Sequence, residues 1–337
     1  MRILYDPAPR KTSEIFTPDS KTQFFADHDV VEVNPSCREA VYSEHLPKTE
    51  ILISQQPMEK AQIDAAENLR AIFNVETNFL PNIDYDACFE RGVHVLTPAS
   101  VFAVPVAEMG LGLALSLLRD IHGAHTDFLS GHEVYGLDGN GQAKLLSDSS
   151  IGLIGFGDLG RALQRLLTPF GAQTRVFDPW LPADYLRRQG VEPASLNDVL
   201  GQSSVVFVTA AVTAENEKLL DRKSLAVMPD GANLVLLSRA ALADFDALSY
   251  EAQSGRLRIA TDVFPTEPVA KDDPIRKTRG ILFSPHRAGA LHSALTQIGA
   301  LVLEDIGQIA RNLPPVSCRR AERETVQRLR SKPIEVS

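Results

Sequence analysis

The chain has 337 residues, more than a single hydrophobic core usually serves, so we expect two domains. Apolar residues at 44% and charged residues at 23% are typical of a globular protein that buries sizeable cores. The formal charge of −9 argues against the basic face that nucleic-acid binding requires, so local positive groups must hold any anionic ligand. Only three cysteines occur, and the start reads as a strand rather than a secretory leader, which predicts reduced thiols and a cytoplasmic protein.

The first hundred residues alternate short apolar runs with helical patterns. The runs at residues 3–5, 30–33, 51–54, 71–75 and 93–96 read as strands. This alternation predicts a small parallel α/β unit. Thr97-Pro98-Ala99 breaks the pattern and predicts a crossover to a second domain.

Residues 101–118 form an apolar run as long as a membrane span. The run contains Pro105 and Glu108, however, and a carboxylate in mid-span is costly in a bilayer. We therefore expect a buried interdomain or dimer helix and no membrane contact. The glycine-rich residues 119–150 predict an extended loop or arm. Its three histidines, at 122, 125 and 132, lack carboxylate or thiolate partners, so no metal site is expected.

The alternation of strands and helices resumes from Ser150. Strand candidates lie at residues 151–155, 174–177, 204–209, 233–237, 258–262 and 281–284. Six strands separated by helical segments predict a doubly wound sheet, with the ligand at the carboxyl ends of the strands. Residues 291–312 read as one helix that returns to the first domain. The charged tail after Cys318 reads as a solvated helix or a frayed end.

A glycine-rich turn directly follows the first of these strands. It reads Gly155-Phe156-Gly157-Asp158-Leu159-Gly160 and opens a helix with one apolar face. The first glycine allows the tight turn, the second lets the backbone approach a pyrophosphate, and the third permits close packing of the helix on the strand. Free N–H groups at the start of the helix then meet the anion. The pattern predicts that these six residues bind a dinucleotide.

Asp178 ends the next strand. A carboxylate there can accept hydrogen bonds from both hydroxyls of an adenosine ribose, and it would repel a 2′-phosphate. The alternative is a strand-end Asp that caps the turn at Pro179. We expect a cofactor-binding role for Asp178, with NAD as the cofactor rather than NADP.

Three further residues could carry chemistry. Arg239 follows the strand at 233–237, where a guanidinium could hold a substrate carboxylate through two hydrogen bonds. Glu267 and His286 follow the last two strands, and a carboxylate beside an imidazole favours its protonated form and fixes its tautomer. Taken alone, each has a simpler interpretation, as a solvated Arg, a loop carboxylate or a capping His. Their order and setting favour the transfer of a hydride and a proton.

Residues 51–313 resemble the D-isomer-specific 2-hydroxyacid dehydrogenase family. Four segments carry the resemblance: VPVAE at 104–108, IGLIGFGDLG at 151–160, LLSRAALADFDAL at 236–248, and ATDVFPTEPV with SPHRAGA at 260–290. Matches that occur in the same order along the chain are more specific than any one motif.

The resemblance implies a role for each catalytic candidate. Arg239 anchors the substrate carboxylate, His286 exchanges a proton with the substrate oxygen, and Glu267 supports the imidazole. The ATDVFPTEPV segment adds Asp262 to the cofactor-binding residues. A homodimer is also implied, and the small residues at 110, 112 and 114 of the long apolar helix suit a dimer contact.

One loop departs from the family pattern. The family usually carries a glycine-rich GxGxD loop before an Ile-Asp pair, whereas this chain has Thr77-Asn78-Phe79 ahead of Ile83-Asp84. Because Asn tolerates left-handed backbone angles, Asn78 could still shape a nest of N–H donors for the substrate carboxylate. Phe79 would then add an apolar wall to the substrate site. The alternative is that Phe79 only fills the domain core.

These observations predict an α/β protein of two Rossmann-like or flavodoxin-like domains with doubly wound parallel sheets. A cofactor domain at residues 99–288 is inserted into a substrate domain that is split between 1–98 and 289–337. The resemblance implies NAD-dependent interconversion of a D-2-hydroxy acid and its 2-oxo acid. Alternatives are a glyoxylate or hydroxypyruvate reductase, a phosphoglycerate dehydrogenase, or an NAD-sensing corepressor-like binding protein.

Overall fold

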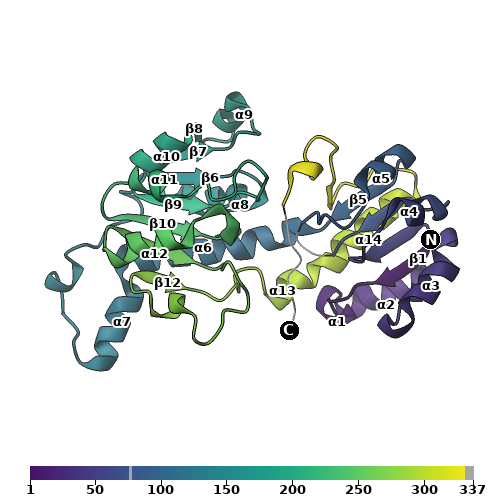
Figure 1. Cartoon of the computed structure of the whole chain (residues 1–337), viewed down its shortest axis with the longest axis horizontal. Helices are drawn as coiled ribbons and strands as arrows, with labels where there is room; N and C mark the ends of the chain where they lie inside the picture. Colours follow the sequence, from purple (N-terminus) through teal and green to yellow (C-terminus); the bar gives the residue numbers. More distant parts are fainter. Residues whose placement is uncertain (76–77, 331–337) are drawn as a thin grey trace. The chain divides into compact units, whose positions relative to one another are not determined.

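A computed structural model describes residues 1–75 and 78–330 of the chain (Figure 1). The chain divides into two compact units. Unit 1 comprises Met1–Phe102 and Ala290–Ser337, and unit 2 comprises Ala103–Gly289. Unit 2 is therefore inserted into the sequence of unit 1. From the sequence, the two domain boundaries are expected after residues 98 and 288.

Unit 1 contains a six-stranded sheet in the order β13-β5-β4-β3-β1-β2. The strands are β1 Arg2–Asp6, β2 Asp29–Glu32, β3 Ile51–Ser54, β4 Ala71–Phe73, β5 His94–Thr97 and β13 Arg319–Arg320. Strands β1 to β5 are parallel and follow the flavodoxin-like order, as predicted. Apart from the edge strand β2, these five strands are almost wholly buried, as expected for parallel strands with both faces covered.

The helices of unit 1 pack around this sheet. They are α1 Thr12–Ile15, α2 Pro18–Asp27, α3 Arg38–His45, α4 Lys60–Ala65, α5 Tyr85–Arg91, α13 His292–Leu295 and α14 Gln297–Ala310. The single helix predicted for residues 291–312 is therefore two helices, interrupted at Thr296. The Thr296 hydroxyl donates to the carbonyl of His292 at 3.0 Å, a contact that competes with helical hydrogen bonding and bends helices.

The predicted solvated tail after Cys318 was wrong in part. Asp305 of α14 is fully buried and accepts hydrogen bonds from the backbone N–H groups of Val316, Ser317 and Cys318 at 2.7 to 2.9 Å. The chain then pairs antiparallel with β5 as β13. Because these contacts join residues that are distant in sequence, they leave no periodic pattern.

Unit 2 contains a seven-stranded parallel sheet in the order β12-β11-β10-β9-β6-β7-β8. The strands are β6 Ile151–Ile154, β7 Thr174–Phe177, β8 Glu192–Pro193, β9 Val205–Val208, β10 Ala232–Leu236, β11 Leu257–Thr261 and β12 Ile281–Phe283. The order is that of a doubly wound sheet with its switch point between β6 and β9, which confirms the predicted Rossmann-like class. The missed strand β8 has only two residues, one of them a proline.

Two groups of helices contact the sheet of unit 2. The helices are α6 Ala103–Arg119, α7 Ile121–Ser130, α8 Asp158–Leu167, α9 Ala183–Arg188, α10 Leu196–Gln202, α11 Arg222–Ala226 and α12 Phe245–Gln253. α6 packs on α8, β10 and β11. In the second group, α11 contacts both α10 and α12. Side chains of α10 to α12 share one buried core with β6, β9 and β10, and this core fixes the strand ends that carry the predicted site.

The long apolar helix α6 packs inside unit 2. By length and composition alone, residues Ala99–Arg119 could cross a membrane, but over half of that stretch is buried in the fold. Ala114 is fully buried, and a side chain at Gly110 would collide with Leu237. These two small residues therefore serve packing within unit 2, not the dimer contact that the sequence suggested for them. Gly112, the third of these small residues, is exposed.

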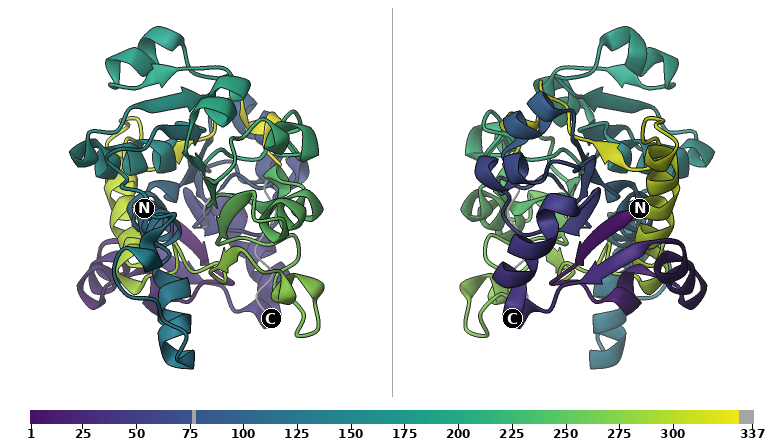
Figure 2. Two further views of the ribbon diagram at one scale, coloured as in Figure 1. Left: turned by 90° about the vertical axis from the view of Figure 1, so that its left-hand side faces the viewer. Right: turned by 90° about the vertical axis from the view of Figure 1, so that its right-hand side faces the viewer.

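An arm projects from the rest of unit 2 (Figures 1 and 2). It begins with α7, none of whose residues is buried, so the predicted extended loop is partly helical. Large apolar side chains of the arm are more than half exposed: Ile121, Phe128, Leu129, Val134, Tyr135, Leu137 and Leu145. So many exposed apolar side chains in one short segment are unusual on the surface of a monomer.

Candidate active site

The glycine-rich turn joins β6 to α8, as predicted. Gly155 has φ +92°, and an added Cβ there would lie 2.5 Å from Cα of Ala210. An added Cβ on Gly160 would lie 2.5 Å from the carbonyl oxygen of Gly155. At Gly157, which precedes α8, no atom lies within 4 Å of an added Cβ. The fold itself requires the first and third glycines, and the second leaves open space beside the helix start, which suits a cofactor phosphate.

Asp178 braces this turn from the end of β7. One carboxylate oxygen accepts the backbone N–H of Phe156 at 2.8 Å, and the other accepts that of Trp180 at 3.0 Å. Asp178 therefore caps the turn at Pro179, as the alternative interpretation of its sequence position predicted. Each oxygen keeps a second lone pair, so the carboxylate can still accept ribose hydroxyls. The residues present fit a dinucleotide.

His286 and Glu267 are in direct contact. Nδ1 of His286 lies 2.5 Å from Oε2 of Glu267, and the two side chains are 29% and 27% exposed. The other oxygen of Glu267 accepts the backbone N–H of Phe264 at 2.8 Å. Because Nδ1 faces the carboxylate, Nε2 is the nitrogen left for a substrate. His286 has φ +49°, an uncommon backbone angle for a residue with a side chain, of the kind found at functional sites.

The loop that carries His286 is wrapped around the carboxylate of Asp262. That side chain is 1% exposed and follows β11. It accepts hydrogen bonds from the Ser284 hydroxyl at 2.5 Å and from the backbone N–H groups of Arg287 and Ala288 at 2.9 Å. Asp262, predicted to bind the cofactor, thus holds the histidine loop. Ser284 was missed from the sequence because one serine ahead of a proline carries no specific signal.

Arg239 emerges at the same edge of the sheet. It follows β10, which pairs in parallel with β11, and β11 pairs with β12. Parallel neighbours bring their carboxyl ends together, so Arg239, Glu267 and His286 leave adjacent strands at one edge. The guanidinium is half-buried, and Nη1 donates to the carbonyl of Ser238 at 2.7 Å.

The remaining predicted substrate residues lie in unit 1. Thr77 falls outside the described residues. The carbonyl of Asn78 accepts the side-chain amide of Asn74 at 3.0 Å. Phe79 is 5% exposed within the core of unit 1 and makes an edge-to-face contact with Tyr85, at 6.3 Å between ring centroids. This burial favours the core-filling alternative over an apolar wall.

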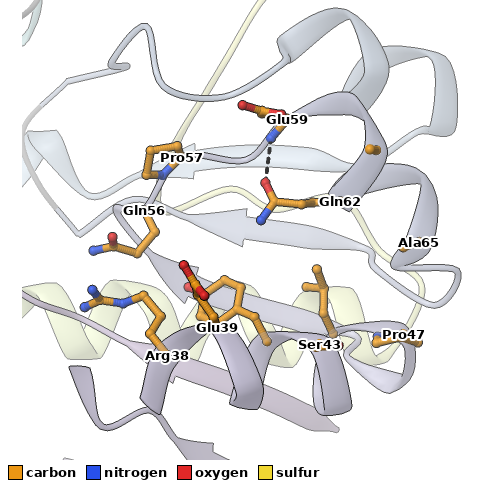
Figure 3. Close-up of a pocket in the computed structure, with 12 residues that line it drawn as sticks. Arg38, Glu39, Ser43, Pro47, Gln56, Pro57, Glu59, Gln62 and Ala65 are labelled. Atoms are coloured by element: carbon orange, nitrogen blue, oxygen red, sulfur yellow. Dashed lines mark hydrogen bonds between the residues drawn. The ribbon is translucent and has the colours of Figure 1, made fainter. Parts of the chain in front are cut away.

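A separate groove lies between α3 and α4 in unit 1. It is lined by side chains that include Arg38, Tyr42 and Gln56 (Figure 3). Arg38 forms an ion pair with the buried Asp6 at 2.7 Å, and the Tyr42 hydroxyl lies 2.8 Å from that of Ser54. Burial raises the pKa of Tyr42, so its hydroxyl stays neutral. Among the described residues that line this groove there are none of the predicted site residues.

Comparison with known proteins agrees with this geometry. Residues 111–288 match the family model described as the NAD-binding domain of D-isomer-specific 2-hydroxyacid dehydrogenases. A solved structure of a phosphoglycerate oxidoreductase from Rhizobium etli is 44% identical, with a TM-score of 0.88 over 96% of this chain and 99% of that chain. A hydroxypyruvate reductase from Thermotoga maritima is 29% identical over 79% of this chain and 89% of its own length.

Some relatives are longer. A D-3-phosphoglycerate dehydrogenase from Methanocaldococcus jannaschii is 26% identical over 74% of this chain but only 47% of its own length. The chain spans about half the length of this relative and, at 54%, of the corresponding enzyme from Archaeoglobus fulgidus. The family match covers more than half of the chain, and the Rhizobium relative covers nearly all of it. The protein therefore belongs to the D-isomer-specific 2-hydroxyacid dehydrogenase family, and residues 111–288 form its NAD-binding domain.

Proposed function

We propose that the protein is an NAD-dependent oxidoreductase that interconverts a D-2-hydroxy acid and its 2-oxo acid. The observation that carries the proposal is the contact between Glu267, which follows β11, and His286, which follows β12, at the carboxyl edge of an NAD-binding sheet. Arg239 follows β10, the strand next to β11. NAD supplies the hydride chemistry when it is bound. The relatives named as dehydrogenases and reductases support this activity.

The side chains have distinct tasks in this mechanism. His286 donates a proton from Nε2 to the carbonyl oxygen during reduction and removes it from the hydroxyl during oxidation. Glu267 fixes the tautomer through Nδ1 and stabilises the protonated imidazole. Arg239 binds the substrate carboxylate through two parallel hydrogen bonds and so orients the reacting carbon.

The test is NADH consumption against 2-oxo acids that differ in chain length and charge. Turnover of any of them supports the proposal. A preference for hydroxypyruvate, glyoxylate or a phosphorylated 2-oxo acid would select among the narrower alternatives, which the names of the relatives suggest. Tight NADH binding without turnover across the panel would favour the NAD-sensing alternative.

The carboxylate of Asp178 should set the preference for NAD over NADP. A 2′-phosphate would meet a negative charge held in place by Phe156 and Trp180. Replacing Asp178 with Ser should therefore lower the ratio of kcat/KM for NADH to kcat/KM for NADPH by about 10-fold, the effect of one charge-assisted contact. A wild-type enzyme that prefers NADPH would contradict this assignment.

Phe79 should contribute to stability and not to substrate choice. Phe79→Leu keeps an apolar side chain but has three fewer carbons and removes the edge contact with Tyr85, so the free energy of unfolding should fall by at least about 0.5 to 1.5 kcal/mol. The ranking of 2-oxo acids should stay unchanged. Denaturant unfolding and the substrate panel check both parts, and a changed ranking at unchanged stability would restore the specificity role.

A second copy of this chain should cover the exposed arm. The large apolar side chains of α7 and of the segment after it are more than half exposed, and dimers commonly bury such surfaces. Replacing both Phe128 and Leu129 with Asp should convert a dimer into a monomer, because charges are excluded from an apolar interface. Light scattering measures the mass, and a monomeric wild-type protein would exclude the dimer.

A further inference from the structure

The first turn of α8 carries a negative charge where the cofactor phosphate should bind. Asp158 is the first residue of α8 and directly follows Gly157, the glycine with open space around it. Backbone N–H groups at a helix start attract anions, but a carboxylate at the same place repels them. The binding of a dinucleotide here therefore depends on what offsets Asp158.

Arg161 is the group that offsets it. Its Nη2 lies 2.7 Å from Oδ1 of Asp158, and its Nη1 donates to the carbonyl of Phe156 at 3.2 Å. These two contacts hold the guanidinium against the residues before and after Gly157. The side chains of Arg161 and Asp158 are 36% and 28% exposed, so solvent and a ligand can reach both.

We propose that Arg161 binds the pyrophosphate of NAD, and that Asp158 holds the guanidinium at the turn and weakens the binding of that anion. The inference rests on the NAD-binding domain and adds a residue to its site. Without cofactor, the two side chains neutralise each other. The pyrophosphate then shares Arg161 with Asp158, so the pair sets the affinity for the cofactor. Arginine suits this task because its fork of donors can serve two oxygen acceptors.

The proposal predicts opposite effects for the two partners. Calorimetric titration with ADP at low salt should show about 10-fold weaker binding for Arg161→Ala, because the contact with the phosphates is lost and Asp158 is then unopposed. Asp158→Asn should bind ADP about 2- to 5-fold more tightly. The double variant should recover only the part of the loss that comes from the unopposed Asp158, and full recovery would mean that Arg161 does not contact the phosphates. Adenosine lacks the phosphates and should bind all variants equally, and high salt should shrink the differences.

A matched control is available in the same unit. Arg187 pairs with Asp184 at 2.6 Å with the same spacing along a helix, and Arg187→Ala should leave the binding of ADP unchanged. Thermal unfolding, together with Arg161→Gln as a second variant, separates misfolding from lost binding. Wild-type affinity for ADP in both Arg161 variants, or equal weakening in Arg187→Ala, would overturn the proposal. ADP binding requires no substrate, so this result is independent of whether any 2-oxo acid is turned over.

Discussion

Replacing His286 with Asn should lower kcat for every 2-oxo acid by about 10²- to 10⁴-fold, the usual contribution of general acid–base catalysis. Asn cannot supply a proton at Nε2, the nitrogen that faces away from Glu267. The dissociation constant for NADH should stay close to the wild-type value, because the glycine-rich turn and Asp178 are untouched. Steady-state kinetics and NADH titration measure the two quantities.

Glu267→Gln tests the partner of this imidazole. The amide carries no negative charge, and its single oxygen can replace the contact with Nδ1 of His286 or the contact with the N–H of Phe264 but not both. The imidazole is then held less firmly, so kcat for carbonyl reduction should fall below the wild-type value. Full activity in His286→Asn would remove the imidazole from the mechanism.

Replacing Asp262 with Asn should lower kcat by about 10- to 100-fold, because an amide can accept hydrogen bonds on only one side. The carboxylate now accepts from Ser284, Arg287 and Ala288, and one of these donors would face the amide N–H₂. The loop would then no longer hold His286 in its uncommon backbone conformation. Affinity for NADH should change little.

The pattern of kinetic changes separates two roles for Asp262. If its main task is to contact the cofactor, as the sequence suggested, the dissociation constant for NADH should rise while kcat stays near the wild-type value. Ser284→Ala removes one of the three donors and leaves the charge, so its loss in kcat should be smaller than that of Asp262→Asn. Equal losses would show that the serine, not the carboxylate, holds the loop.

Most of the fold could be predicted because parallel sheets leave a strong local signal. The strands of unit 2 with four or more residues are short, mainly apolar segments between helical segments, and all were predicted within a few residues. The missed strands β8 and β13 have two residues each and form by pairing with distant partners. The break between α13 and α14 at Thr296 was not predicted, because a single hydroxyl contact leaves the apolar pattern of the helix intact.

The placement of the candidate residues was predictable where a local motif determines it. The glycines lie in the turn between β6 and α8, and Glu267 lies beside His286, as the sequence suggested. Asp262 and Phe79 were harder, because burial and partners decide their roles, and neither can be deduced from residue type alone. Arg161 was missed because its contact with the carbonyl of Phe156 in the glycine-rich turn is visible only in the structure.

The proposed activity is tested most directly by stereospecific oxidation. The protein is supplied with NAD and, separately, with the D and L forms of each 2-hydroxy acid whose 2-oxo acid it reduces, and NADH formation is followed. We predict NADH with the D form only, and its loss in His286→Asn. NADH formation with the L form alone, or with neither form of any acid in the panel, would contradict the proposed function.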